Sequence, residues 1–416
     1  MGVSAWLADQ ATRAPHVLTV EVPGWSGRRM DAEATLRRRG WRPAQSPADA
    51  DVLLVCGIPG HELRRCVDRV WEQLPGPRAR VDLTDAERVD DALDVAVAVL
   101  RDRDHQGADA RRRTSTGAAE PTGPDESPDA APGHDPGSMD PSSMDPSSMD
   151  MGSMDMPMPG GIPLAGDGAD RDGLNLDVLH LPLGPVLPHW PAGLVVECVL
   201  QGDVVTSASV RLLASGALAP TPEPGSGGDV RVRAARSCDS AARLLAVAGW
   251  GAASAAASAV RDGLRGDVPL AVCAGQLASL RHRVRRSRSL ATVLGGVGRI
   301  EDHDGSLRDA DARLASRWWA DDAAARLQRW LAHAHALAEG VEDAGDAGGA
   351  GDAGNADFGA DLPATDPVAA AQTALGVLPA MLAGHELSAV RLIVASLDPD
   401  TGALAAVRVG ADGGAR

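Results

Sequence analysis

The residues best suited to hold a metal ion are methionines in a short repeat. Residues 136–159 run PGSMD, PSSMD, PSSMD, MGSMD and MPMP. Thioether sulfurs are soft ligands of the kind that hold Cu(I). The same low-complexity pattern is typical of a flexible spacer, so a soft-metal site and a plain linker both stay open. The candidate ligands are Met139, Met144, Met149, Met154, Met156 and Met158.

A second candidate site is the stretch 182–205, PLGPVLPHWPAGLVVECVLQGDVV. Its four prolines stiffen a loop that leads into an apolar strand over 194–200, a turn at Gln201-Gly202 and a returning strand. Such a loop presents side chains at a fixed place, as a binding site does. The residues singled out are Gly184, Pro185, Pro188, His189, Trp190 and Gly202.

Other reactive side chains give weaker signals. Five cysteines without a CxxC pair are typical of buried, reduced thiols. His333 and His335 are two residues apart on an expected helix, so they point to different faces and make a poor metal pair. The arginine-rich run at 281–288 suggests nucleic acid or anionic lipid as a ligand, but an exposed or subunit-facing helix surface is the simpler interpretation in an acidic chain.

Composition limits the function classes. The chain has 416 residues, a formal net charge of -17, no Lys and no Tyr. An acidic total argues against a nucleic-acid-binding protein. The abundant Arg, Ala, Gly and Asp suggest a GC-rich codon bias. The sequence shows no secretory signal and no apolar run of membrane-spanning length. We therefore expect a cytoplasmic protein that reaches the inner face of the membrane, if at all, only through partners.

The chain divides into three parts. Residues 1–100 alternate strands and helices and predict a three-layer α/β domain, with a last helix over 85–100 capped by Thr84. Residues 101–161 predict a disordered linker that carries the Met repeat. Residues 162–416 predict a β-hairpin region followed by a helical domain, with a disordered acidic insert at about 341–361. The overall class is α+β.

The helical part has its own expected boundaries. Ser237 or Asp239 caps a first helix that ends at Val260. Further helices are expected over 271–290, 308–339 and 367–382, then a strand over 389–396 and a turn over 398–402.

The segment 48–83 resembles the small, cluster-bearing subunit of respiratory complex I and of NiFe hydrogenases. Its matching residues are Ala50-Asp51, Gly57, Trp71-Glu72-Gln73-Leu74-Pro75 and Pro77-Arg78. In that family, cysteines after two of the strands and a later cysteine hold a 4Fe–4S cluster. This chain has Val22-Pro23-Gly24-Trp25 and Val81-Asp82-Leu83-Thr84 at the two strand positions. The resemblance therefore implies the fold without the cluster.

The stretch 184–205 resembles the entrance hairpin of the large, quinone-site subunit of complex I, which is related to the nickel-bearing hydrogenase subunit. Gly184, Pro185, Pro188, Leu194, Leu200, Gly202, Val204 and Val205 fall in register. Segments 280–300 and 378–402 resemble later parts of the same family. The family's two hairpin histidines fall at Leu187 and Pro191, and its quinone-binding Tyr and nickel-binding CxxC pairs have no counterpart here.

Together these features predict a fused, redox-inactive scaffold, assembly or interaction protein. Its halves are expected to dock on each other, and complex I or hydrogenase-type subunits are the expected partners. We expect no catalytic residue and neither a 4Fe–4S cluster nor another cofactor, with Cu(I) left open at the Met repeat. Two alternatives remain: a residual oxidoreductase subunit that uses a partner's centres, and a protein that binds Cu(I) through the repeat.

Overall fold

The computed structural model describes residues 14–85, 87–117, 166–169, 175–217, 230–299, 321–340 and 367–413. It is mixed α/β, with one parallel and one antiparallel sheet, as the sequence predicts. The Met repeat and the acidic insert at 341–361 lie outside the described residues.

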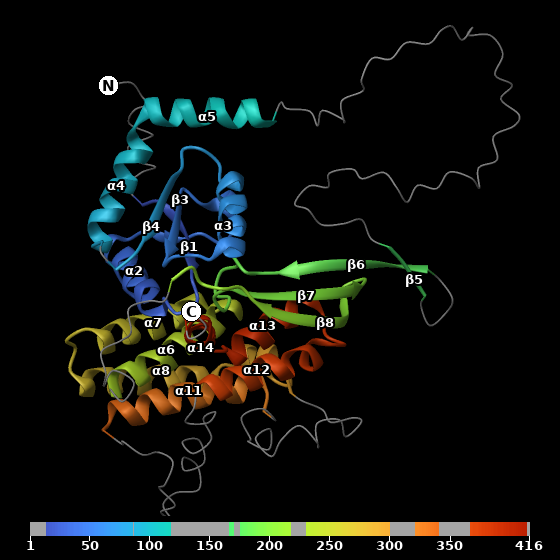
Figure 1. Ribbon diagram of the computed structural model, residues 1–416. Helices are drawn as coiled ribbons and strands as arrows, with labels where there is room; N and C mark the ends of the chain where they lie inside the picture. Colours follow the sequence, from blue (N-terminus) through green and yellow to red (C-terminus); the bar gives the residue numbers. More distant parts are fainter. Residues whose placement is uncertain are drawn as a thin grey trace, which may run out of the picture.

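The N-terminal part is built on a parallel sheet of order β2-β1-β3-β4. The central strand, VLLVC, is apolar along its whole length because both of its faces are buried. Helices α2 and α4 pack on one face and α3 on the other (Figure 1). The elements are β1 (His16–Glu21), α2 (Ser26–Arg39), β2 (Arg42–Pro43), β3 (Val52–Cys56), α3 (His61–Gln73), β4 (Ala79–Leu83) and α4 (Val89–Arg101).

Two predictions near the end of this part are wrong. Helix α4 begins at Val89, so Thr84 does not cap it. The expected linker begins with a helix, α5 (Arg103–Gly117). This helix is anchored by a buried ion pair in which Arg78 Nε lies 3.0 Å from Asp109 Oδ2. Polar composition alone suggests disorder there, but a partner 31 residues earlier in the chain holds the segment.

The second sheet is antiparallel and contains the predicted hairpin. Its order is β5-β6-β7-β8, with Gly202 at the turn between the last two strands. One face of the hairpin, including Val196, Cys198 and Leu200, packs on the helices. The elements are β5 (Gly166–Ala169), β6 (Asn175–Leu183), β7 (Leu194–Gln201) and β8 (Val204–Leu212).

The remaining elements are helices, and several expected boundaries are wrong. The helix expected from a cap at Ser237 or Asp239 to Val260 begins at Val230, and it is two helices separated at Gly249, where φ is +81°. The one expected over 271–290 is broken at Ser287, whose side chain accepts a hydrogen bond from the Leu290 amide. The helices are α6 (Val230–Val247), α7 (Gly251–Arg265), α8 (Leu270–Arg286), α9 (Arg288–Leu294), α11 (Ala323–Ala338), α12 (Pro367–Leu382), α13 (Leu387–Leu397) and α14 (Thr401–Gly413).

The strand expected over 389–396 is wrong, because these residues form helix α13. A short run rich in Val, Ile and Leu fits either a buried strand or a buried helix, and periodicity does not separate them. The expected turn at 398–402 contains the C-cap of α13 and the start of α14. Of the helix expected over 308–339, α11 covers the C-terminal part and residues 308–320 lie outside the described residues.

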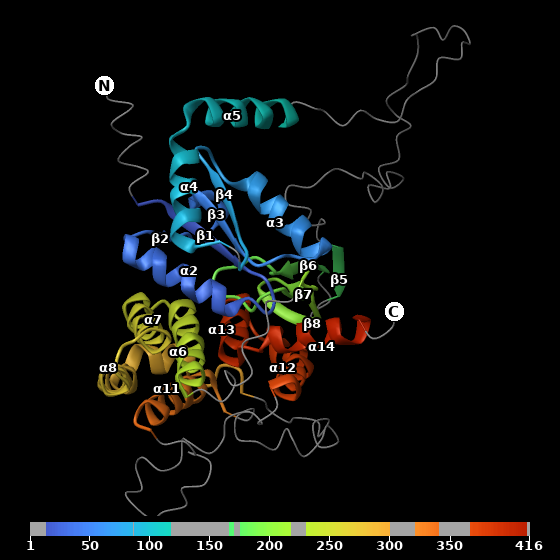
Figure 2. The same cartoon turned by 60° about the vertical axis from the view of Figure 1, so that its left-hand side comes forward.

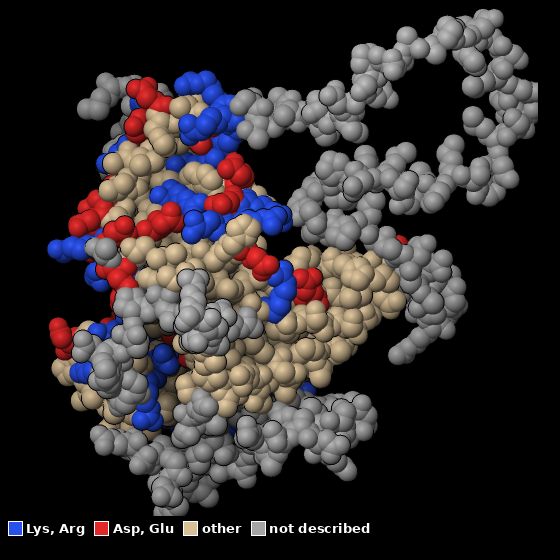
Figure 3. Space-filling view, viewed as in Figure 1, with Lys and Arg blue, Asp and Glu red and all other residues tan. Residues whose placement is uncertain are grey.

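The parallel-sheet part lies above the helices, and the hairpin sheet extends to one side between them (Figures 1 and 2). Charged side chains gather over the N-terminal part, whereas the surface over the hairpin is mostly uncharged (Figure 3). None of the helices in the described ranges is long and apolar enough to cross a bilayer.

Candidate functional site

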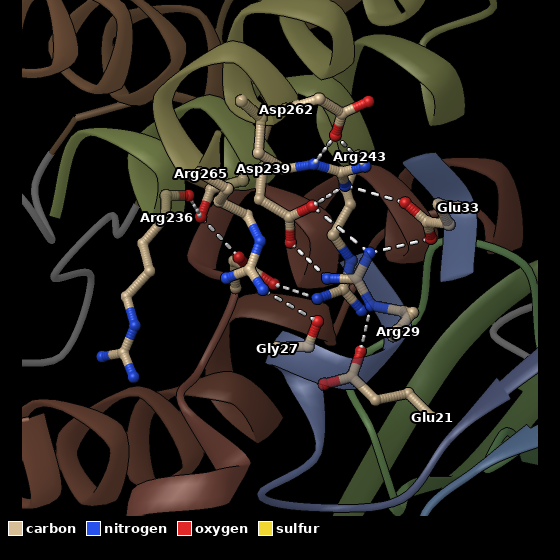
Figure 4. Close-up of polar contacts among 12 residues, drawn as sticks. Glu21, Gly27, Arg29, Glu33, Arg236, Asp239, Arg243, Asp262 and Arg265 are labelled. Atoms are coloured by element: carbon tan, nitrogen blue, oxygen red, sulfur yellow. Dashed lines mark hydrogen bonds and ion pairs between the residues drawn. The ribbon is translucent and has the colours of Figure 1, made fainter. Parts of the chain in front are cut away.

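A buried network of charged side chains joins the N-terminal part to the helices. Helix α2 contributes Arg29, Glu33 and Arg37, which are four residues apart and so share one face. That face lies against α6 and α7, which carry Asp239 and Arg261. Figure 4 shows Arg29 and Glu33 of α2 and Asp239 of α6 pointing toward one another.

Arg29 is the centre of the network and is 6% exposed. Its Nε donates to Glu21 Oε2 at 2.6 Å and its Nη1 to Glu33 Oε1 at 2.8 Å. Its Nη2 donates to Asp239, which lies 210 residues further along the chain. One guanidinium therefore contacts three carboxylates, two of them in the N-terminal part and one on α6.

A second guanidinium repeats this pattern from the other side. Arg261 is 1% exposed, and its Nη1 donates to Glu33 Oε2 at 2.7 Å and to Asp239. Its Nη2 donates to Asp262 at 3.1 Å, and Arg37 Nε donates to the same carboxylate at 3.0 Å. Asp239 is thus shared by one arginine from each half of the chain.

A third group of contacts ties the network to the C-terminal helices. Arg243 Nη1 lies 3.1 Å from Asp398 Oδ1, and Ser240 Oγ donates to Asp398 Oδ2 at 2.6 Å. Arg243 also donates to the carbonyl of Trp190 in the proline-rich loop. Asp398 has φ +38°, a left-handed conformation that is uncommon for a residue other than glycine. Such residues gather at sites that the surrounding structure holds in place.

The pKa values show which charges the network favours. Burial opposes ionisation of Asp239, but Arg29 and Arg261 outweigh it and hold the pKa of this carboxyl well below its usual range. The same balance lowers the pKa of Glu33 to about 2. Burial also opposes the charge of Arg29, yet the carboxylates around it raise its pKa. For Glu21 and Asp398 burial dominates and raises the pKa. Opposite charges in direct contact neutralise one another, which favours a structural role for the centre of the network over proton transfer.

A cavity of about 480 Å³ lies beside this network. Its walls are the proline-rich loop on one side, β1 and α2 on another, and α6 and α7 on the third. Arg29, Glu33 and Arg261 provide charged groups, while Leu187, Trp41 and Ala246 provide apolar surface. A cavity of this size with a few polar groups can hold a small organic molecule.

The structure brings most of the predicted loop residues together at this cavity. Pro185, Pro188, His189 and Trp190 line it, and Gly184 lies next to them. The indole Nε1–H of Trp190 donates to the Leu194 carbonyl at 2.8 Å. Gly202 is not part of the site, because it lies at the far turn of the hairpin, where a Cβ would meet no heavy atom within 4 Å. Leu187 lines the cavity, and Pro191 lines a smaller pocket of about 140 Å³.

His189 is the titratable side chain of the loop. Its φ of +60° places it in the left-handed region. Burial, together with Arg243 and Arg29, lowers its pKa to about 4. The imidazole is therefore neutral near pH 7, and it offers the cavity a hydrogen-bonding group without a charge.

The five cysteines are free and lie on different elements, as expected for structural thiols. Burial raises the pKa of Cys56 and Cys238 and raises that of Cys198 to about 11. These thiols stay protonated near pH 7, whereas metal ligation needs the thiolate. In the described part of the chain, no group of three or more His, Cys, Asp and Glu side chains has a metal-binding arrangement. Because the Met repeat lies outside that part, Cu(I) binding stays a prediction.

The two helix histidines have separate environments. His335 Nδ1 contacts Arg281 at 3.2 Å, whereas His333 is buried and its Nδ1 lies 2.9 Å from Ser237 Oγ. Burial, with a contribution from Arg233, lowers the pKa of His333 to about 4. The two side chains therefore do not form a common site.

His333 predicts a pH effect on stability. A group whose folded pKa is depressed below its unfolded value of 6.5 contributes stability above pH 6.5 that is lost as the pH falls toward 4. Between pH 6.5 and 4.5, the free energy of unfolding should fall in the wild type. In His333→Asn the fall over the same pH range should be smaller by about 2 kcal/mol. Urea unfolding at several pH values measures this difference. His180→Asn, at an exposed position of β6, should keep the wild-type slope, and equal slopes in all three proteins would contradict the assignment.

The charged network does not follow from the sequence alone. Codon bias accounts for the abundance of arginine, but it does not indicate which arginines are buried. One local signal exists, the series Arg29, Glu33 and Arg37 at helical spacing on α2. The partners on α6 and α7 are more than 200 residues away and have no local signal.

Comparison of the chain with protein-family models, curated proteins and solved structures finds no match. The resemblance to complex I and hydrogenase subunits is therefore carried by the residues named above alone.

Proposed function

We propose that the protein is a redox-inactive scaffold or assembly protein whose halves resemble the small and large peripheral-arm subunits of complex I and NiFe hydrogenases. One observation carries the proposal: the contact between the halves is occupied by charged side chains that pair with one another. The resemblance implies that related proteins place redox ligands on these two subunits. In this chain, by contrast, the contact between the halves holds Arg29, Asp239 and Arg261, which form ion pairs.

The network suits a scaffold because it fixes geometry. Each guanidinium donates hydrogen bonds in a fixed planar pattern, so carboxylates from three elements must take defined positions around Arg29. A partner that touches both halves then meets one preformed surface. Protein partners of the complex I or hydrogenase type follow from the resemblance and belong to the proposal.

Affinity purification from the native cell tests the scaffold function. We expect tagged wild-type protein to co-purify with respiratory or hydrogenase subunits, and Asp239→Ala to lose those that contact both halves. Glu197→Ala removes an exposed carboxylate of β7 that pairs with Arg211, and it should retain them. If wild-type protein retains no such subunit, the scaffold proposal fails.

The cavity favours a second candidate function, that of a subunit which binds a small organic redox molecule and uses a partner's centres. The apolar loop wall and the charged floor match a molecule with a flat body and polar substituents, such as a short-chain quinone.

A cavity-filling substitution tests this candidate. Ala246→Phe places a large side chain in the cavity from α6 and should weaken binding of a short-chain quinone at least about tenfold, measured by quenching of tryptophan fluorescence. Ala252→Phe, at an exposed position of α7 outside the cavity, is the control. Equal binding by both variants would show that the cavity does not bind the quinone.

Cu(I) binding by the Met repeat stays a separate proposal that rests on the sequence. A Cu(I) titration compares the wild type with a variant in which Met139, Met144, Met149 and Met154 are Ala, and equal affinity would exclude the repeat as the site.

A further inference from the structure

Helices α8 and α9 carry a surface on which all of the charged side chains are basic. Their sequences contain no Asp or Glu, although the whole chain has a formal net charge of -17. The outward side chains of α8 line a shallow surface that is open to solvent. We call this surface the arginine face, and it consists of Arg281, His282, Arg283, Arg285, Arg286 and Arg288.

Several arginines elsewhere in the protein are paired with carboxylates. Arg29, Arg39 and Arg80 each contact at least two carboxylates. Within the described ranges, by contrast, no carboxylate lies within 4.0 Å of any arginine of the arginine face. Two of these arginines contact histidines instead, Arg281 with His335 at 3.2 Å and Arg286 with His282 at 3.3 Å. The buried Nε of Arg281 has no hydrogen-bond partner among the described residues. A cluster of like charges with no carboxylate in direct contact attracts anions.

The C-terminal end of α11 lies beside the arginine face. His335, in the last turn of α11, contacts Arg281 and lies 3.3 Å from Glu339 Oε2. The chain leaves α11 at Glu339-Gly340 and continues as VEDAGDAGGAGDAGNADFGAD. This sequence has six carboxylates and no basic residue: Glu342, Asp343, Asp346, Asp352, Asp357 and Asp361. The first of them is three residues from Glu339.

We propose that the acidic segment 341–361 docks on the arginine face of α8 and α9 within the same chain. The segment is acidic and the arginine face is basic, so their charges are complementary. The segment also begins beside the arginine face, just after the C-terminal end of α11. About 20 residues reach up to roughly 70 Å when extended, which is longer than α8 needs. Covalent connection gives the segment a millimolar effective concentration, so it competes with any anion in solution. Apart from Asn355 and Phe358, the residues between the acids are Gly and Ala, whose small side chains let the backbone follow the helix closely.

The absence of lysine provides a direct test. Arg285→Lys introduces the only side-chain amine in the protein, and a water-soluble carbodiimide joins that amine to any carboxylate in contact with it. We expect intramolecular cross-links from position 285 to carboxylates of 341–361, mapped by mass spectrometry, and their loss in 1 M NaCl, where the screening length is about 3 Å. Arg65→Lys, at an exposed position of α3, is the matched control and should give no such cross-link.

Three outcomes would overturn the proposal: no cross-link from position 285 to 341–361, cross-links only between two copies of the chain, or equal cross-linking from position 65. A second measurement does not depend on cross-linking. A variant with all six carboxylates of the segment changed to amides should bind fluorescein-labelled heparin about tenfold more tightly than the wild type, because the competing segment is lost. Equal binding would show that the arginine face is open in the wild type and so contradict docking.

Discussion

Asp239→Ala is expected to lower the free energy of unfolding by about 3–5 kcal/mol, because it leaves two buried guanidiniums with fewer carboxylates. Arg29 is 6% exposed and Arg261 is 1% exposed, so water cannot replace the lost partner. Arg29 keeps Glu21 and Arg261 keeps Asp262, and both arginines still share the carboxylate of Glu33. Urea unfolding measures the change as a lower midpoint.

An exposed ion pair is the control for this variant. Glu197→Ala removes the partner of Arg211 on the hairpin, where both side chains are about half exposed. Exposed pairs contribute about 0–1 kcal/mol, so this variant should differ little from the wild type. If the two variants have the same midpoint, the network does not hold the halves together.

Gly184→Ala is expected to be the second most damaging change, at about 3 kcal/mol. Its Cβ would lie 2.3 Å from the Leu194 carbonyl oxygen and 2.5 Å from Trp190 Nε1, so the hydrogen bond between these two atoms must break or shift. The φ of +84° adds a conformational cost for any residue with a side chain. Overpacking and the left-handed backbone together give the expected size.

The hairpin supplies a matched control for the steric part of this effect. Gly202 also has a positive φ, +62°, but a Cβ at this position would have no heavy atom within 4 Å. Gly202→Ala should therefore cost only the backbone contribution, about 1–2 kcal/mol. Urea unfolding of both variants separates the steric and backbone contributions. Equal losses of unfolding free energy would mean that the position of Trp190 does not require the absence of a side chain at Gly184.

The elements that could be predicted are those whose signal is local. β3 is five consecutive buried apolar residues, and the hairpin is two apolar strands around a glycine turn. The shape of the loop at Pro185 and Pro188 follows in the same way, because proline restricts its own backbone and that of the preceding residue.

The features that could not be predicted depend on distant partners. Helix α5 is held by the Arg78–Asp109 pair, and neither residue is unusual in its own segment. Helix α13 has the composition of a strand and becomes a helix in contact with α6 and α11. In the site, the loop was predicted but the network beneath it was not, because Arg29 and Asp239 are 210 residues apart in the sequence.

Whether the chain can hold a redox centre is decided by iron and sulfide analysis with electron paramagnetic resonance, on protein reconstituted anaerobically with iron and sulfide. We predict iron far below the four atoms per chain of a cubane cluster, and no cluster signal after reduction, because the cysteines are dispersed and protonated. A full-occupancy 4Fe–4S signal would contradict the proposal that this chain is a redox-inactive scaffold.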